Sequence, residues 1–252
     1  MTRLSLRFQE ELRRFASASA FLTRVPLGSC EKVEPQIYLH FPLIGALIGL
    51  TAAGSYCLLS LLYSPVIATL GAILVPIVLT GALHEDGFAD VCDAFGGYTK
   101  DERLSIMHDS RIGSFAAIGI CLLIGIKGGF LASLPSPSAI AALVFGHAIS
   151  RWAIIITVTF TSNFVEQRSF TAWVFSGLTF AHGCITGLVP IALGLFLWGI
   201  AGLFTIVVTI VFAKLSGRFF LRFIGGLTGD ALGAVASIAE VLAYAVLSGA
   251  WG

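Results

Sequence analysis

The amino-acid sequence predicts an all-α protein: a polytopic integral membrane helix bundle with about seven transmembrane helices (roughly six to eight) and an amphipathic interfacial helix at the amino end. Hydrophobic residues make up 57% of the 252 residues, charged residues make up 12%, and the mean hydropathy is +0.94. Soluble domains contain about 25% charged residues, and this chain has too few polar side chains to cover its surface in water. We therefore expect one membrane-embedded domain over residues 1–252, in contact with the lipid bilayer.

Residues 1–35 are the predicted cytoplasmic or interfacial amino-terminal segment. Apolar side chains recur on one helical face, at Leu4, Phe8, Leu12 and Phe15. The arginines available to contact lipid headgroups are Arg3, Arg7, Arg13 and Arg14. The segment lacks the compact apolar stretch of a cleaved signal peptide, so we expect an amphipathic helix on the membrane surface.

Polar residues divide the remaining chain into the predicted spans, each of roughly 20 apolar residues, as a bilayer core of about 30 Å requires. The turn signals Ser64-Pro65 and Pro135-Ser136-Pro137 each separate two of them. The apolar stretch 174–211 is too long for one helix and is expected to fold back near Trp198. The spans are expected near residues 41–63, 65–83, 114–134, 138–160, twice within 174–211, and 231–251.

The basic residues predict the orientation, because lysine and arginine favour cytoplasmic loops. Lys127 and Arg151 fall inside predicted spans, and an odd number of spans places the other basic residues on one side: Arg3, Arg7, Arg13, Arg14, Arg24, Lys32, Lys100, Arg103, Arg111, Arg168, Lys214, Arg218 and Arg222. This pattern predicts a multi-pass protein of the cytoplasmic (inner) membrane with a cytoplasmic amino end. The formal net charge of +1 argues against a nucleic-acid partner.

Half of the acidic residues fall between residues 85 and 109, and the densest group is Glu85, Asp86, Asp90 and Asp93. A helix would place the three aspartates on one face. The apolar residues between them favour an extension of the second span over a solvated acidic loop, which is the alternative. Mg²⁺ binds through one or two carboxylates plus substrate phosphates, so this group is the candidate metal site of a cytoplasmic acidic catalytic loop at residues 84–113.

Two further polar segments are candidates for binding phosphate. Asp109, Ser110 and Arg111 precede the third span, and an arginine can hold a phosphate with two parallel hydrogen bonds. Arg111 would also suit a salt bridge to an aspartate or a cytoplasmic anchor. The glycine-rich run 225–233 contains Thr228 and Asp230, either of which can cap the last span. A simple helix-entry turn is the alternative there, and Asp230 is a further possible metal ligand.

Three charged residues fall within the predicted spans: Lys127, Arg151 and Glu240. Charges in the lipid zone are costly unless they are paired or face a hydrated cavity, so they are functional candidates. Pairing of Glu240 with Lys127 or Arg151 is the structural alternative. His147 is interpreted as a helix-packing residue outside the site. The five cysteines are scattered and are interpreted as free thiols.

Several strings occur together in a characteristic order: FLTRVP at 21–26, FPLIG at 41–45, TGALHEDGFAD at 80–90, DAFGG at 93–97, IMHDSRIG at 106–113 and LTGD at 227–230. With them the chain resembles the cobalamin synthase family, the membrane-bound adenosylcobinamide-GDP ribazoletransferases. The resemblance runs from about residue 20 to 235. The H-E-D-G-x-x-D-x-x-D block at residues 84–93 is its most specific part.

The resemblance implies a Mg²⁺-dependent phosphotransferase that faces the cytoplasm. Its substrates would be adenosylcobinamide-GDP and α-ribazole or α-ribazole 5'-phosphate. The product would be adenosylcobalamin or adenosylcobalamin 5'-phosphate, and GMP would be released. In this hypothesis the metal ligands are Glu85, Asp86, Asp90 and Asp93. The catalytic residues are Asp90, Asp93 (which accepts the ribazole proton) and Arg111. Substrate binding involves Asp109, Ser110, Arg111, Thr228, Lys127 and Arg151.

Two other function classes compete with this interpretation. A CDP-alcohol phosphatidyltransferase would also use aspartates at a diphosphate, but its D-x-x-D-G-x-x-A-R pattern does not occur here, because Asp90 follows Asp86-Gly87-Phe88-Ala89 where the pattern continues with alanine and arginine. A small-solute transporter would use charges near the membrane midplane, whereas Glu240 is the one acid clearly within a predicted span. The 28 glycines permit close helix contacts within one chain or between chains, so a homo-oligomer stays open.

Overall fold

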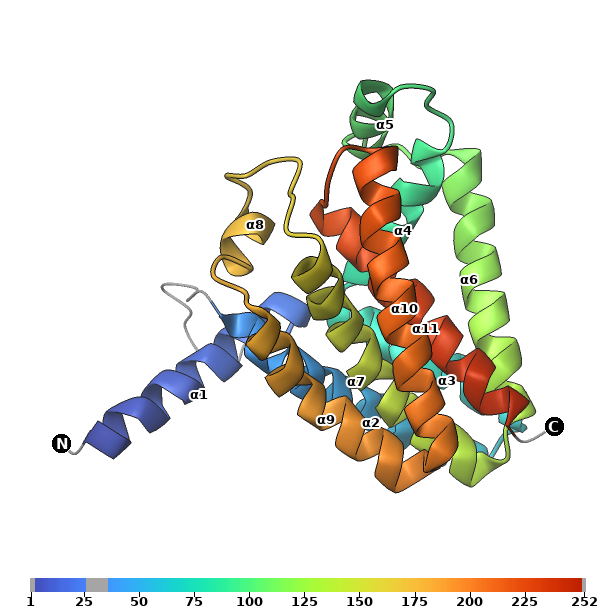
Figure 1. Ribbon diagram of the computed structural model, residues 1–252. Helices are drawn as coiled ribbons and strands as arrows, with labels where there is room; N and C mark the ends of the chain where they lie inside the picture. The colour runs from blue at the N-terminus through green and yellow to red at the C-terminus, as the bar shows by residue number, and fades with distance from the viewer. Residues whose placement is uncertain (1–2, 26–35, 251–252) are drawn as a thin grey trace.

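The computed structural model describes residues 3–25 and 36–250, and for residues 3–7 it describes the backbone alone. Within these ranges the protein is all-α, as predicted (Figure 1). The elements are α1 (Arg3–Leu22), η1 (Ile37–His40), α2 (Phe41–Ser60), α3 (Pro65–Thr80), α4 (Leu83–Ala94), α5 (Lys100–Met107), α6 (Ser114–Ser133), α7 (Ser136–Phe160), α8 (Phe170–Val174), α9 (Phe180–Trp198), α10 (Ile200–Phe223) and α11 (Gly229–Gly249).

The number of helices able to cross a membrane agrees with the sequence. In the described residues, 6 helices are long and apolar enough, or up to 7 if the bent pair α3 and α4 counts as one span. The predicted turn near Trp198 is present: α9 ends there, and Gly199 adopts a φ of 54° between α9 and α10. The all-α membrane bundle is therefore confirmed.

Helix α7 forms the centre of the bundle, and 89% of its most apolar 18-residue stretch is buried inside the protein. Helix α2 crosses it closely at Gly45 and Gly49, where an added Cβ would meet the backbone around His147 and Leu143. By contrast, only 22% of the most apolar 18-residue stretch of α6 is buried, and only 28% of that of α9. Because their exposed side chains are apolar, such as Phe115 and Leu188, these two helices present their surfaces to lipid.

The chain turns sharply between α3 and α4, which are bent by 92° relative to each other. Gly81 and Ala82 both adopt left-handed backbone conformations, with φ values of 69° and 60°. They end α3 with the N–H of Ala82 donating to the carbonyl of Ile77 at 2.8 Å. The acidic segment thus follows the second apolar helix as a helix of its own, packed in the bundle and bent away from α3 rather than continuous with it.

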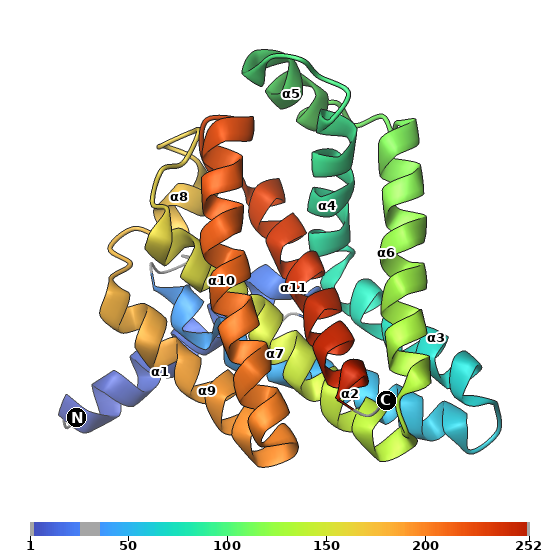
Figure 2. The same ribbon diagram turned by 45° about the vertical axis from the view of Figure 1, so that its right-hand side comes forward.

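Helix α10 is longer than expected and continues through Lys214, Arg218 and Arg222 to Phe223. These basic residues were expected in a loop, but they lie on the last turns of the helix. Charged side chains with long apolar stems can occupy the end of a spanning helix because the charge reaches the polar interface. Figure 2 shows this end of α10 beside α4 and α5, where α6 also begins.

Helix α1 is confirmed, and its first turns extend away from the bundle (Figure 1). Phe8 and Leu12 are exposed, whereas Leu22 at the other end is buried in the core. Placement of α1 on a membrane surface stays a prediction. The side chains of Leu4, Arg3 and Arg7, and residues Cys30 and Lys32, lie outside the described parts of the chain.

Candidate functional site

Asp86, Asp90 and Asp93 share one face of α4, which we call the acidic face. This face lies against the beginning of α11. Their backbones meet at Gly87, where an added Cβ would stand 2.7 Å from Cα of Asp230. Asp86 is exposed, and Asp90 and Asp230 are half-buried. The negative charges of Asp86, Asp93 and Asp230 all act on the Asp90 carboxylate. The tertiary fold therefore adds Asp230 to the acidic group that the sequence pattern indicated.

The acidic group is not a preformed metal cage. Across the described residues, no three or more histidine, cysteine, aspartate or glutamate side chains are arranged to hold one metal ion. Mg²⁺ commonly uses one or two carboxylates and takes its other ligands from water and substrate phosphates. Asp86, Asp90 and Asp230 offer oxygen donors of that kind at one edge of the bundle.

Asp93 connects α4 to the start of α6. Its two carboxylate oxygens accept hydrogen bonds from the backbone N–H groups of Gly113 at 2.6 Å and Ala116 at 2.8 Å. A carboxylate at this position satisfies N–H groups that lack partners in the first turn of a helix and suits the positive end of its dipole. Asp93 thereby fixes one end of the loop that carries Asp109, Ser110 and Arg111.

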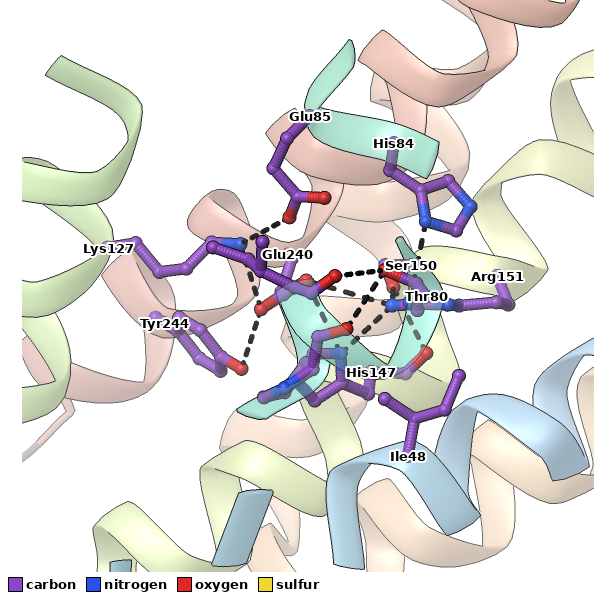
Figure 3. Close-up of polar contacts among 12 residues, drawn as sticks. Ile48, Thr80, His84, Glu85, Lys127, His147, Ser150, Arg151, Glu240 and Tyr244 are labelled. Atoms are coloured by element: carbon purple, nitrogen blue, oxygen red, sulfur yellow. Dashed lines mark hydrogen bonds and ion pairs between the residues drawn. The ribbon is translucent and has the colours of Figure 1, made fainter. Parts of the chain in front are cut away.

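Glu85 points toward Lys127 and Glu240 (Figure 3), whereas Asp86 is exposed. Oε1 of Glu85 lies 3.8 Å from Nζ of Lys127, and the Glu85 side chain is 15% exposed. Glu85 therefore belongs to a buried ionic cluster, which we define as His84, Glu85, Lys127, His147, Arg151, Glu240 and Tyr244.

Glu240 is the hub of the buried ionic cluster. Its carboxylate oxygens lie 3.2 Å from Nζ of Lys127 and 3.7 Å from Nη1 of Arg151, and the Tyr244 hydroxyl donates to Oε1 at 3.0 Å. Arg151 Nη1 also donates to Nδ1 of His147 at 2.9 Å. With neutral histidines, the two basic residues balance Glu85 and Glu240. The pairing alternative for Glu240 is thus what the structure shows, and substrate binding by Lys127 and Arg151 stays a prediction.

The loop between α5 and α6 presents a charged pair to solvent. Asp109 Oδ2 lies 2.6 Å from Nη2 of Arg111, and Oδ1 accepts from the Arg111 backbone N–H at 3.0 Å. The hydrogen bonds from the Arg111 side chain and backbone lower the pKa of Asp109 to about 2. Arg111 is therefore held by its own loop and does not pair with the α4 acids. Ser110 beside it is exposed.

Thr228 caps α11, because its hydroxyl oxygen accepts the N–H of Ala231 at 3.1 Å. Two cavities adjoin the residues that follow, Gly229 and Asp230. One has a volume of about 160 Å³ and reaches toward α1, α2 and α8. The other, of about 130 Å³, is lined by polar groups that include His108 and Glu166. Asp230 thus stands between two cavities and faces the acidic helix.

Residues 14–248 match the family model described as cobalamin-5-phosphate synthase. The chain belongs to that family. The matched region includes every candidate site residue, from Glu85 in α4 to Thr228 before α11.

Named relatives of this cobalamin-5-phosphate synthase family agree along nearly the whole chain. An adenosylcobinamide-GDP ribazoletransferase from Ralstonia pickettii (strain 12J) is 36% identical over 247 residues, which cover 93% of this chain and 94% of the relative. One from Shewanella frigidimarina (strain NCIMB 400) is also 36% identical, with 96% of both chains covered. One from Shewanella amazonensis is 34% identical. No solved structure matches the chain significantly.

The sequence pattern did not indicate the part that His84 and Tyr244 play in the buried ionic cluster. His84 Nδ1 lies 3.5 Å from Nη2 of Arg151. The position of His84 directly before Glu85 in the sequence could have indicated that it belongs to the same cluster. Tyr244 lies one helical turn after Glu240, a spacing that places both on one face of α11. The contacts between cluster members on different helices could be found only from the tertiary fold.

Proposed function

We propose that this chain is an adenosylcobinamide-GDP ribazoletransferase of the cytoplasmic membrane, with its active site on the cytoplasmic side at the acidic face of α4. The observation that carries the proposal is the approach of Asp230 to Asp86 and Asp90 within a chain that belongs to the family. In this reaction the ribazole hydroxyl forms a new bond to the cobinamide-linked phosphorus, and the bond from that phosphorus to GMP breaks.

The donor set fits Mg²⁺, which would be held by one or two of the carboxylates of Asp86, Asp90 and Asp230 and would take its other ligands from water and substrate phosphates. When bound, Mg²⁺ supplies neutralisation of the charge that develops on the diphosphate and on the departing GMP. Asp86 is the exposed member and is available to ligands that approach from solution. Glu85 stays part of the proposed metal group, although its carboxylate lies toward Lys127.

The chain's own residues would orient the two substrates and move one proton. Arg111 is exposed and could exchange its bidentate contact with Asp109 for one with a substrate phosphate. A carboxylate of the acidic face would accept the proton of the ribazole hydroxyl. Asp93 is the candidate from sequence, but it would first have to release the N–H groups of Gly113 or Ala116. This geometry favours Asp90 for the proton and Asp93 for positioning.

The test is a transfer assay with purified protein in lipid vesicles, supplied with Mg²⁺, adenosylcobinamide-GDP and α-ribazole 5'-phosphate. We expect stoichiometric GMP and a joined corrinoid product. Asp86→Asn and Asp90→Asn should each lower the rate about 100-fold or more, because stabilisation of developing charge is commonly worth that much. Asp101→Asn is the matched control, since Asp101 is exposed on α5.

Near-normal GMP release by Asp86→Asn or Asp90→Asn would contradict the placement of the site. Absence of any transfer by the wild-type protein would contradict the function itself. Uptake of a corrinoid into the vesicles without chemical change would instead support a transporter. Omitting Mg²⁺ and adding other divalent cations tests the metal dependence separately.

A further inference from the structure

The larger of the two cavities beside Asp230 has a wall of aromatic rings. Phe21 from α1 and Phe41 from α2 stack with centroids 5.5 Å apart and planes 9° apart. Phe175, directly after α8, meets Phe41 edge to face, at 6.0 Å and 87°. All three side chains line the cavity. Because these rings also pack against one another, the wall is rigid and preformed for a flat aromatic group.

The polar groups of the same cavity lie at defined places. His84 lines it and is only 5% exposed. Its Nδ1 lies 3.5 Å from Nη2 of Arg151, and no hydrogen bond joins its Nε2 to another of the described residues. Nε2 can therefore form a hydrogen bond with a nitrogen of a heteroaromatic ligand. Asp230 lies on the side of the cavity that adjoins α4.

The size of the cavity limits what it can hold. Its volume is about 160 Å³. An apolar cavity of about 150 Å³ in another protein binds one benzene molecule, whereas pockets for drug-sized ligands measure roughly 300–1,000 Å³. The cavity thus suits a small planar ring system and excludes a corrin or a complete nucleotide.

We infer that this cavity binds the planar aromatic base of the ribazole substrate. The ribose then leaves the cavity past Asp230 and presents its hydroxyl to the acidic face of α4. This inference rests on the proposed function and deepens it, because it assigns one of the two substrates to a specific side of Asp230. It also explains why an aromatic wall inside a membrane bundle adjoins an acidic helix.

The first experiment fills the cavity from its rim. Leu83 lines the cavity and is 41% exposed, so Leu83→Trp can enlarge the side chain toward the cavity from its rim. We expect the KM for α-ribazole 5'-phosphate to rise at least tenfold, while the KM for adenosylcobinamide-GDP changes less than threefold. Leu58→Trp is the matched control, because Leu58 is 66% exposed on α2 and does not line the cavity.

A second variant and a ligand series keep the test decisive. Thr171→Leu fills the same cavity from α8 and replaces the first variant if Leu83→Trp does not fold. For either variant, the loss should be smaller with the riboside phosphate of imidazole, a smaller base, than with α-ribazole 5'-phosphate. An unchanged KM for α-ribazole 5'-phosphate in both variants would overturn the inference. Equal increases for both substrates, or equal losses for both bases, would overturn it as well.

Equilibrium dialysis separates this inference from the proposed function. Radiolabelled α-ribazole 5'-phosphate should bind the wild-type protein without adenosylcobinamide-GDP and should bind Leu83→Trp at least tenfold more weakly. If binding follows this pattern but no transfer occurs, the proposed function fails and the cavity assignment stands. If transfer occurs and both proteins bind equally, the cavity assignment fails alone. Displacement of the bound label by a fatty acid would overturn the cavity assignment, because the cavity would then accommodate a lipid chain.

Discussion

Replacing Glu240 with glutamine removes the carboxylate that Lys127 and Arg151 share inside the bundle. Lys127, Arg151 and Glu240 are each less than 5% exposed. The nearest carboxylate that remains is Glu85, whose Oε1 lies 3.8 Å from Nζ of Lys127. Glu240→Gln therefore leaves two buried cations facing one partly exposed anion, without changing the size of the side chain.

The size of the effect follows from this loss of charge balance. Breaking a buried ion pair by removing one partner costs about 3–5 kcal/mol, because a charge is left uncompensated. Glu85 retains part of the compensation, so we expect about 3 kcal/mol of destabilisation for Glu240→Gln. Lys127→Met should also destabilise the protein, since it leaves an excess of negative charge. The double variant restores neutrality and should be less destabilised than the sum of the two by at least about 1 kcal/mol.

Unfolding by SDS in mixed detergent micelles, followed by tryptophan fluorescence, measures these free energies of unfolding. Glu10→Gln on the exposed face of α1 is the control and should change the free energy by less than about 0.5 kcal/mol. A Glu240→Gln variant as stable as this control would refute the reasoning. Strict additivity of Lys127→Met and Glu240→Gln would show that the two charges are not coupled.

Three further predictions concern the acidic face and its loop. Asp93→Ala loses the hydrogen bonds to Gly113 and Ala116, so it should cost about 1–3 kcal/mol and speed proteolysis within residues 108–113, which limited digestion can detect. Gly87→Ala places a Cβ 2.7 Å from Cα of Asp230 and should separate α4 from α11, lowering kcat in the transfer assay by at least about tenfold. Gly125→Ala, which meets nothing within 4 Å, is its control. Asp109 has a pKa lowered to about 2 by Arg111, so its contribution to stability is present above the unfolded pKa of about 4 and is lost as the pH falls toward 2. Arg111→Ala should return the Asp109 pKa toward its ordinary value, as an NMR titration of the carboxyl carbon would reveal.

The helical spans were predictable because their apolar length is a local property of the sequence. The predicted turn at Trp198 and the end of α7 at Phe160 agree with the structure. The break before α4 was not anticipated, since it depends on left-handed conformations at Gly81 and Ala82. Alanine rarely adopts that conformation, so nothing in its side chain signalled the turn.

The candidate site was predictable to the level of the helix that carries it. Helical spacing placed Asp86, Asp90 and Asp93 on one side of α4, but it did not determine the partner of each carboxylate. Asp93 contacts the backbone of α6, and Glu85 contacts Lys127, because those groups come from helices distant in sequence. The meeting of Asp230 with Asp86 likewise depends on the packing of α11 at Gly87.

The sequence by itself determined that this protein is a helical membrane bundle, because too few charges remain to cover a surface in water. It also determined which segment is acidic. Only the tertiary structure decided that Lys127, Arg151 and Glu240 neutralise one another, and that Asp230 joins the acidic face. The physical reason is that hydrophobicity is read along the chain, whereas charge compensation inside the bundle depends on distances of a few ångströms between different helices.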